Sequence, residues 1–205
     1  MDIVVNRKRG WAAIFIPRCG GTSLKYAAYL DQYGKPFDIE QKHTHIHEYL
    51  RTHDNDIVFQ SLAKTDGLIR FAVWRPPIER SYSLWRGFTQ RDGWRYGAFR
   101  PAWKKDWSHW CRFLPRHFRS GGRRDPHVMP QTNLYDPDRL DFIVPIYLLD
   151  IFMMEKFDQA MEHHASSRTI QVEQGEMKAR DTAKIAKLYV ADDMIPLHKS
   201  FWRGP

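Results

Sequence analysis

Residues 12–25 read AAIFIPRCGGTSLK, and the rest of the fold can be built outward from this stretch. It begins with an apolar run, residues 12–16, of the kind that forms a buried strand. Pro17 ends the run, because proline cannot donate a hydrogen bond to a strand ladder. The glycine pair at 20–21 allows a sharp turn and a close approach of the backbone to a ligand. The Thr-Ser pair at 22–23 suits a helix N-terminus, so the stretch predicts a strand, a turn and a helix start that can bind an anion.

Further apolar runs alternate with helical patterns along the chain. Strands are predicted at 69–74 and 141–146, with a shorter one at 37–43. Helices are predicted over residues 24–30, 45–51, 78–88, 103–118, 149–161 and 181–190. Alternating strands and helices predict a parallel sheet with helices on both faces. We therefore expect one three-layer α/β domain over residues 1–205, with a basic Trp/Arg-rich insertion at 85–126.

Composition narrows the class of protein. The chain has 205 residues and a formal charge of +8, which favours an anionic partner such as a phosphorylated cofactor, a polyanion, a nucleic acid or a membrane surface. Two cysteines do not suggest a disulfide framework. The N-terminus has no apolar signal region, and no run approaches the length of a membrane span. We expect a soluble, cytoplasmic protein.

A second segment adds a candidate anion contact. Residues 71–83 read FAVWRPPIERSYS, which places Arg75 at a strand end and Ser83 eight residues later in a helix. In an open parallel sheet, ligands sit beyond the carboxyl ends of the strands. Arg75 is therefore well placed to reach a phosphate with its planar fork of donors.

These segments together resemble a known family. Residues 17–24 resemble the 5′-phosphosulfate loop of sulfotransferases, P-K-x-G-G-T-S, and residues 71–83 resemble their 3′-phosphate motif, F-x-x-V-R-x-P-x-x-R-x-x-S. Residues 127–131, HVMPQ, resemble the H-x-x-P-Q segment of carbohydrate sulfotransferases, and residues 188–193 resemble their terminal Y-x-x-D helix. The resemblance covers residues 12–195 and implies a P-loop-NTPase-like fold.

The family implies a donor, an acceptor and site residues. The donor is 3′-phosphoadenosine 5′-phosphosulfate, the product adenosine 3′,5′-bisphosphate, and no metal is required. The acceptor is a hydroxyl, expected on a carbohydrate. Carried over by position, the 5′-phosphosulfate site comprises Arg18, Cys19, Gly20, Gly21, Thr22, Ser23 and Leu24. Arg75 and Ser83 would hold the 3′-phosphate, and the expected acceptor contacts are His45, His127 and Gln131.

A histidine-rich segment supplies the expected base. In the carbohydrate branch, a histidine between the two phosphate motifs takes the acceptor proton, and His43 stands at that point, with His45 as the second choice. An imidazole pKa near neutrality suits this role. Two other interpretations remain: His43, His45 and His47 would share a face on a strand, as zinc ligands can, or they are surface residues with no role in the reaction.

Arg18 departs from the family pattern. Many members have lysine there, in contact with the bridging oxygen of the leaving group. Arginine keeps the positive charge and the donors, but it does not give up a proton. Charge stabilisation at this position is therefore expected to persist without proton donation.

Residues 85–124 leave two interpretations open. Tryptophan faces could stack on sugar rings while arginines hold carboxylates or sulfates, as in an acceptor cleft. Alternatively, a helical hairpin buries the tryptophans and the arginines extend to water.

Two other functions compete with sulfuryl transfer. A P-loop nucleotide kinase would need a Walker lysine directly before Thr22, which is absent. A basic nucleic-acid-binding module would leave both phosphate motifs unexplained, so no nucleic-acid partner is expected.

Overall fold

The computed structural model divides into two compact units. It describes residues 2–38, 45–53, 57–59, 61–87, 97–102, 105–120, 124–161, 179–193 and 195–204. The first unit comprises Met1–Trp74, Tyr135–Thr169 and His198–Pro205, and the second Arg75–Leu134 and Ile170–Leu197. The predicted insertion, 85–126, falls within the second unit, and the assignment of a single domain stays a prediction.

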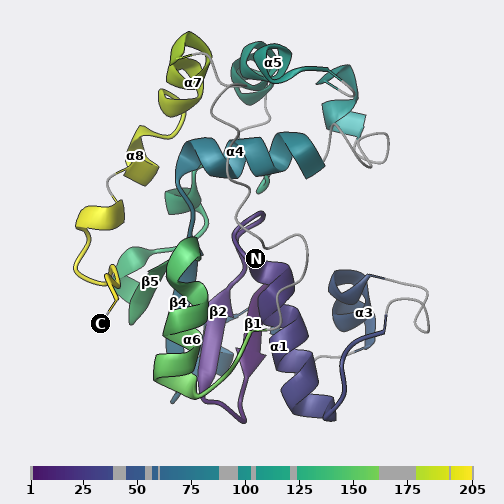
Figure 1. Ribbon diagram of the computed structural model, residues 1–205, viewed down its shortest axis with the longest axis vertical. Coiled ribbons are helices and arrows are strands. Elements are labelled where there is room, and N and C mark those ends of the chain that lie inside the picture. The colour runs from purple at the N-terminus through teal and green to yellow at the C-terminus, as the bar shows by residue number, and fades with distance from the viewer. Residues whose placement is uncertain are drawn as a thin grey trace. The chain divides into compact units, whose positions relative to one another are not determined.

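A five-stranded sheet forms the centre of the first unit (Figure 1). Its strands are β1 (Ile3–Asn6), β2 (Trp11–Ile14), β3 (Val58–Phe59), β4 (Ile69–Trp74) and β5 (Phe142–Pro145). Their order is β3-β1-β2-β4-β5. β2, β4 and β5 pair in parallel, whereas β1 is antiparallel to both of its neighbours. The α/β class and the mostly parallel sheet are confirmed.

The antiparallel strand corrects the expectation of an entirely parallel sheet. β1 and β2 form a hairpin in which Ile3 pairs with Ile14 and Asn6 with Trp11. Gly10, in the turn, has a φ of 76°, a conformation that glycine adopts without strain. The apolar Ile3–Val5 run was available in the sequence, but it is too short to distinguish a strand from a loop by periodicity.

Both faces of this sheet are covered. On one face Trp11 and Phe71 pack against the rings of Phe152 and Phe157 in α6 (Leu149–Phe157). Figure 1 shows α6 and α1 (Gly21–Tyr33) lying along the strands.

The opposite face is covered by irregular segments. Ile3, Val5 and Ala12 pack there against Leu62 and Leu68, which lie in and just after the 3-10 turn η1 (Leu62–Thr65). Phe201, near the C-terminus, packs its ring on Trp74 at the end of β4. Because both faces are buried, the strands read as continuous apolar runs rather than alternating ones.

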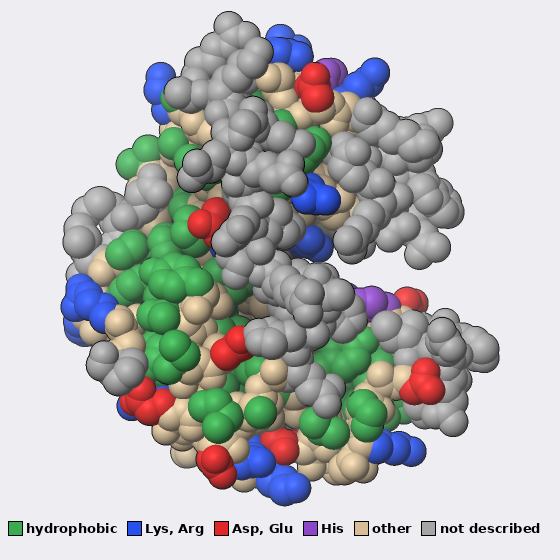
Figure 2. All heavy atoms as spheres, in the orientation of Figure 1, with side chains coloured by type: hydrophobic (Ala, Val, Ile, Leu, Met, Phe, Trp, Pro, Cys, Tyr) green, Lys and Arg blue, Asp and Glu red, His purple; other side chains and the backbone are tan. Residues whose placement is uncertain are grey.

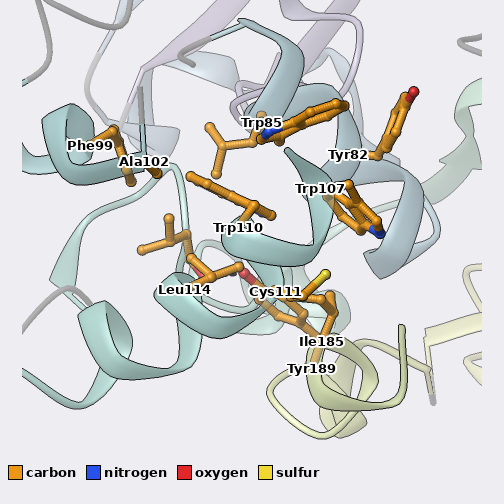
Figure 3. Close-up of a cluster of buried hydrophobic side chains, with 12 residues drawn as sticks. Tyr82, Trp85, Phe99, Ala102, Trp107, Trp110, Cys111, Leu114, Ile185 and Tyr189 are labelled. Atoms are coloured by element: carbon orange, nitrogen blue, oxygen red, sulfur yellow. Dashed lines mark hydrogen bonds between the residues drawn. The ribbon is translucent and has the colours of Figure 1, made fainter. Parts of the chain in front are cut away.

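The second unit is helical. Its described helices are α4 (Pro77–Trp85), α5 (Trp107–Arg119), α7 (Ala179–Ala186) and α8 (Val190–Asp193). Short 3-10 turns are η4 (Gly97–Ala102), η6 (Gln131–Asn133) and η9 (Ile195–Leu197) here, and η7 (Pro137–Arg139) and η8 (Ile146–Leu148) in the first unit. Figure 3 shows side chains from α4, α5, η4 and α7 meeting in one core.

Helix boundaries differ from the predicted ones where a cap intervenes. Helix α5 begins at Trp107 rather than 103, because the Asp106 carboxylate accepts a hydrogen bond from the His109 amide at 2.7 Å. Helix α6 ends at Phe157 because Asp158 adopts a left-handed conformation, with φ 48°. The predicted helix over 181–190 is interrupted by a turn and becomes α7 and α8.

The remaining secondary-structure predictions fall on the segment after α1. Helix α3 (Ile46–His53) confirms the predicted helix over 45–51. Most of the predicted strand over 37–43 lies outside the described residues, and residues 37 and 38 are not in a strand. In the part of the chain that the structure covers, no helix has the length and apolar character needed to cross a membrane.

Candidate functional site

The turn after β2 contains two residues in the left-handed backbone conformation. Arg18 and Gly20 have φ values of 69° and 75°. Gly20 is the N-cap of α1, and its position supplies no side-chain cap. The first amides of a helix have no partner within the helix, so this end of α1 presents donors and a partial positive charge. Arg18 adopts its conformation without being glycine, and such backbone strain collects at functional sites.

Close packing explains both glycines of this turn. A Cβ atom on Gly20 would lie 3.1 Å from Leu149 Cδ2, and one on Gly21 would overlap the ring of Phe15. The backbone therefore approaches its neighbours more closely than any other residue allows. Cys19 and Leu24 are buried on either side of the glycines, and Thr22 is half-buried. The predicted loop residues are thus brought together in one turn.

The Ser23 hydroxyl is a buried polar group at the start of α1. The residue is 4 % exposed, and its hydroxyl has no hydrogen-bond partner among the described residues. Buried polar groups nearly always have a partner, so such an exception requires an explanation. A phosphate or sulfate oxygen at the start of α1 would supply an acceptor for this hydroxyl.

Arg75 and Ser83 belong to the second unit. Arg75 directly follows β4 and is 3 % exposed, with its Nε 3.9 Å from Glu79 Oε2. Burial raises the pKa of Glu79, and the charge of Arg75 opposes this. Ser83 lies in α4 and is 1 % exposed. Arg75 therefore lies at the end of a strand and Ser83 in the helix that follows, as predicted. Both side chains are buried.

Gln131 binds the backbone of Arg75. Its Oε1 accepts from Arg75 N at 3.1 Å, and its Nε2 donates to Arg75 O at 2.8 Å. The segment before it is held by Arg80, whose guanidinium donates to the carbonyls of Pro126, His127 and Met129. Residues 126–131 are thus hydrogen-bonded to Arg75 and Arg80 in the 71–83 segment.

The terminal Y-x-x-D segment joins the same network. Tyr189 Oη donates to Val128 O at 2.7 Å, and burial raises the pKa of Tyr189 to about 12. Asp192 Oδ2 accepts from the amide of Gln131 at 2.8 Å. Three sequence-distant motifs therefore meet within the second unit.

His127 is paired with an acid. Its Nδ1 lies 2.8 Å from Asp125 Oδ1, and its amide donates to the same oxygen at 2.9 Å. Burial favours the neutral carboxyl of Asp125, but the hydrogen bonds from His127 outweigh this and hold its pKa below the ordinary value. His127 is half-buried. Its expected contact with the acceptor substrate stays a prediction.

The histidine segment is only partly described. His43, the expected base, lies outside the described residues, as do its immediate neighbours 39–44. His45 is exposed, and its Nδ1 lies 3.2 Å from the amide of His47. No metal-binding group of three or more His, Cys, Asp or Glu side chains occurs in the described ranges. The zinc interpretation depends on His43 and is not tested.

His47 instead contacts Lys25, a pair that the sequence did not indicate. Lys25 Nζ contacts His47 Nδ1 and lies 3.8 Å from the centroid of the Phe15 ring. On its other side, His47 Nε2 is 3.9 Å from the carboxylate of Asp2, which Arg51 also approaches at 3.8 Å. Lys25 is fully buried one turn into α1, shortly after the turn at 18–23.

Burial sets the charge state of this pair. It lowers the pKa of Lys25 from 10.5 to about 8; Asp2 partly opposes this shift and Arg51 adds to it. Burial, and next the charge of Lys25, lowers the pKa of His47 to about 4. At neutral pH the ammonium of Lys25 therefore donates to a neutral imidazole.

The described tryptophans of the basic stretch are core residues. Trp85, Trp107 and Trp110 are at most 8 % exposed and pack with Tyr82 and Phe99 (Figure 3). Their rings cannot stack on a sugar or a base without unpacking this core. Trp94 and Trp103 lie outside the described residues. For the described part, burial of the tryptophans is confirmed.

Basic side chains do not form one patch on the face drawn in Figure 2. Among the described atoms of that face, Lys and Arg side chains are scattered over the surface. Three positive groups, Lys25, Arg75 and Arg80, are buried instead. Basic side chains therefore lie inside both units as well as on the surface.

The comparisons with known proteins supply no relative. Neither a family model, nor a curated protein, nor a solved structure matches the chain.

Proposed function

We propose that this protein is a sulfotransferase that moves a sulfuryl group from 3′-phosphoadenosine 5′-phosphosulfate to a hydroxyl, expected on a carbohydrate. The observation that carries the proposal is the turn at 18–23, where a strained arginine, a left-handed glycine and a buried, unpartnered Ser23 hydroxyl meet at a helix start. An anion with several acceptor oxygens fits this set of donors.

Each end of the donor has its own candidate residues, one set in each unit. The α1 amides, Arg18 and Ser23 would supply donors for the 5′-phosphosulfate. Arg75 supplies a fork of donors for the 3′-phosphate, which distinguishes this nucleotide from AMP or ATP. We also propose that the core has a three-layer, P-loop-like fold. The proposed reaction requires no metal.

The donor supplies an activated sulfuryl group. Transfer forms a bond between the acceptor oxygen and sulfur and breaks the bond between sulfur and the bridging oxygen of the 5′-phosphate. His43 would take the acceptor proton, since a neutral imidazole is a suitable base at neutral pH. Arg18 and the helix amides would stabilise charge on the transferring group and on the departing adenosine 3′,5′-bisphosphate. Arg18 offers no proton, so the leaving group departs as an anion.

Nucleotide binding tests the proposal directly. Calorimetry should give a micromolar Kd for adenosine 3′,5′-bisphosphate and a clearly weaker one for AMP. Arg75→Ala should abolish this preference. Arg70→Ala is the matched control: it removes an arginine from β4 that pairs with Asp66 and lies outside both motifs, so the preference should persist. Equal binding of both nucleotides by the wild-type protein would refute the proposed donor.

Turnover tests the base. His43→Ala should lose transfer to the acceptor hydroxyl and keep its affinity for adenosine 3′,5′-bisphosphate. Wild-type turnover in this variant would remove His43 from the reaction. His53→Ala is the matched control: it replaces an exposed histidine at the end of α3, outside the motif segments, and should keep wild-type turnover.

A further inference from the structure

Gln131 satisfies both backbone groups of a single residue. Its Oε1 accepts from the N–H of Arg75 and its Nε2 donates to the C=O of Arg75, at 3.1 and 2.8 Å. Gln131 is 0 % exposed. It lies 56 residues from Arg75 in the sequence. Both ends of the amide are therefore used inside the protein, rather than presented to a sugar.

This clamp acts where the strand ladder ends. β4 pairs with β5 up to Trp74, opposite Pro145, and Pro76 and Pro77 follow Arg75 directly. Beyond the last paired residue, the chain direction depends on whatever binds the Arg75 peptide groups. The Gln131 side chain bonds the N–H and C=O of Arg75, the groups that a neighbouring strand would otherwise bond. These bonds fix the backbone from which the Arg75 side chain extends.

Asp192 holds Gln131 in turn. One carboxylate oxygen, Oδ2, accepts from the backbone N–H of Gln131 at 2.8 Å and from its side-chain Nε2 at 3.4 Å. The other, Oδ1, accepts from Thr132 N at 3.0 Å and from Thr132 Oγ1 at 3.2 Å. Asp192 is fully buried, and hydrogen bonds to a buried carboxylate are stronger than neutral ones. The H-x-x-P-Q and Y-x-x-D segments are thereby connected to Arg75 through two side chains.

We propose that Gln131, held by Asp192, is a positioning residue that fixes Arg75 for recognition of the 3′-phosphate. The inference rests on the proposed function, because it assigns Gln131 to the nucleotide rather than to the acceptor. A positioning residue acts only through the group that it orients. Its loss should therefore weaken the discrimination between adenosine 3′,5′-bisphosphate and AMP, and leave the affinity for AMP nearly unchanged.

The test uses Gln131→Met, which keeps the volume and removes the two hydrogen bonds to Arg75, together with a longer one from Gln131 Nε2 to Asp192 Oδ2 at 3.4 Å. The measured quantity is the ratio of the Kd for AMP to the Kd for adenosine 3′,5′-bisphosphate. We expect this ratio to fall at least tenfold in the variant. In an Arg75→Ala background the same replacement should produce no further fall, since the group through which it acts is already absent.

Gln159 provides the matched control. It is equally a buried glutamine with internal hydrogen bonds, from Trp11 Nε1 at 2.8 Å and to Ala27 O at 3.2 Å. Gln159→Met should therefore lose comparable stability in the first unit and keep the wild-type ratio. A ratio that falls equally in both glutamine variants would mean that only general destabilisation is measured and would overturn the inference.

Other outcomes separate the two claims. A wild-type protein without preference would refute the proposed function, whereas a selective wild type and an equally selective Gln131→Met variant would refute the positioning role alone. If Gln131→Met does not fold, Asp192→Asn decides the question, because it keeps Gln131 but weakens its support. A reduced ratio in that variant supports the inference, and an unchanged ratio overturns it.

Discussion

Replacing Lys25 with methionine should change how stability depends on pH. Lys25 is fully buried, and burial lowers its pKa from 10.5 to about 8. The unfolded chain therefore keeps the lysine proton up to about pH 10.5, whereas the folded protein releases it near pH 8. Between these values the unfolded state binds more protons, so the free energy of unfolding of the wild type rises with pH.

The size of the effect follows from the same shift. The interval between 10.5 and about 8 corresponds to about 3 kcal/mol, at about 1.4 kcal/mol per pH unit. Below pH 8 the wild type bears this full cost of a buried ammonium, and above pH 10.5 it bears none. The methionine variant has no such group. Its stability relative to wild type should thus fall by about 3 kcal/mol as the pH rises through this interval.

Urea unfolding at a series of pH values from 7 to 10.5 measures this difference. Other titrating groups act on both proteins and cancel. Lost contacts with Phe15 and His47 shift the whole curve but do not produce its slope. Lys35→Met, which removes the same charge at an exposed position just after α1, is the control for the loss of a lysine charge as such. A flat difference for Lys25→Met would refute the reasoning.

Three further outcomes are expected from the same structure. In Lys25→Met, the pKa of His47 should rise from about 4 toward its ordinary value, since Lys25 contributes to the shift; imidazole NMR titration measures it, and an unchanged pKa would contradict the contact. Gly20→Ala should cost about 1–2 kcal/mol of unfolding free energy, because a non-glycine residue there is left-handed and its Cβ crowds Leu149; an unaffected unfolding midpoint would argue against this turn geometry. Trp110→Ala should cost about 3–5 kcal/mol by thermal or urea unfolding, because a fully buried ring is lost; a loss below 1 kcal/mol would place the indole at the surface.

The two strongest strand predictions rest on local chemistry. The apolar runs before Pro17 and before Pro76 are strands β2 and β4, and each proline lies just beyond its strand. Helix α1 starts at Gly21, one position after a glycine that accepts the left-handed conformation. These features depend on residues within a few positions of one another, which is why the sequence predicts them.

Features that depend on distant partners were missed or left open. β1 is apolar but only four residues long, and its identity as a strand depends on pairing with β2 and β3. The tryptophans of α5 have the same composition whether they face a cleft or a core. Their burial is decided by packing against α4 and α7, which lie far away in sequence.

The candidate site divides in the same way. By itself the sequence determined the turn at 18–23, because glycine conformation, a proline stop and a helix start are local properties. Only the tertiary structure decided that Gln131 clamps Arg75 and that Lys25 is buried against His47. Hydrogen bonds across 56 residues and the desolvation of a charge depend on what the fold places around a side chain, and no local pattern encodes that environment.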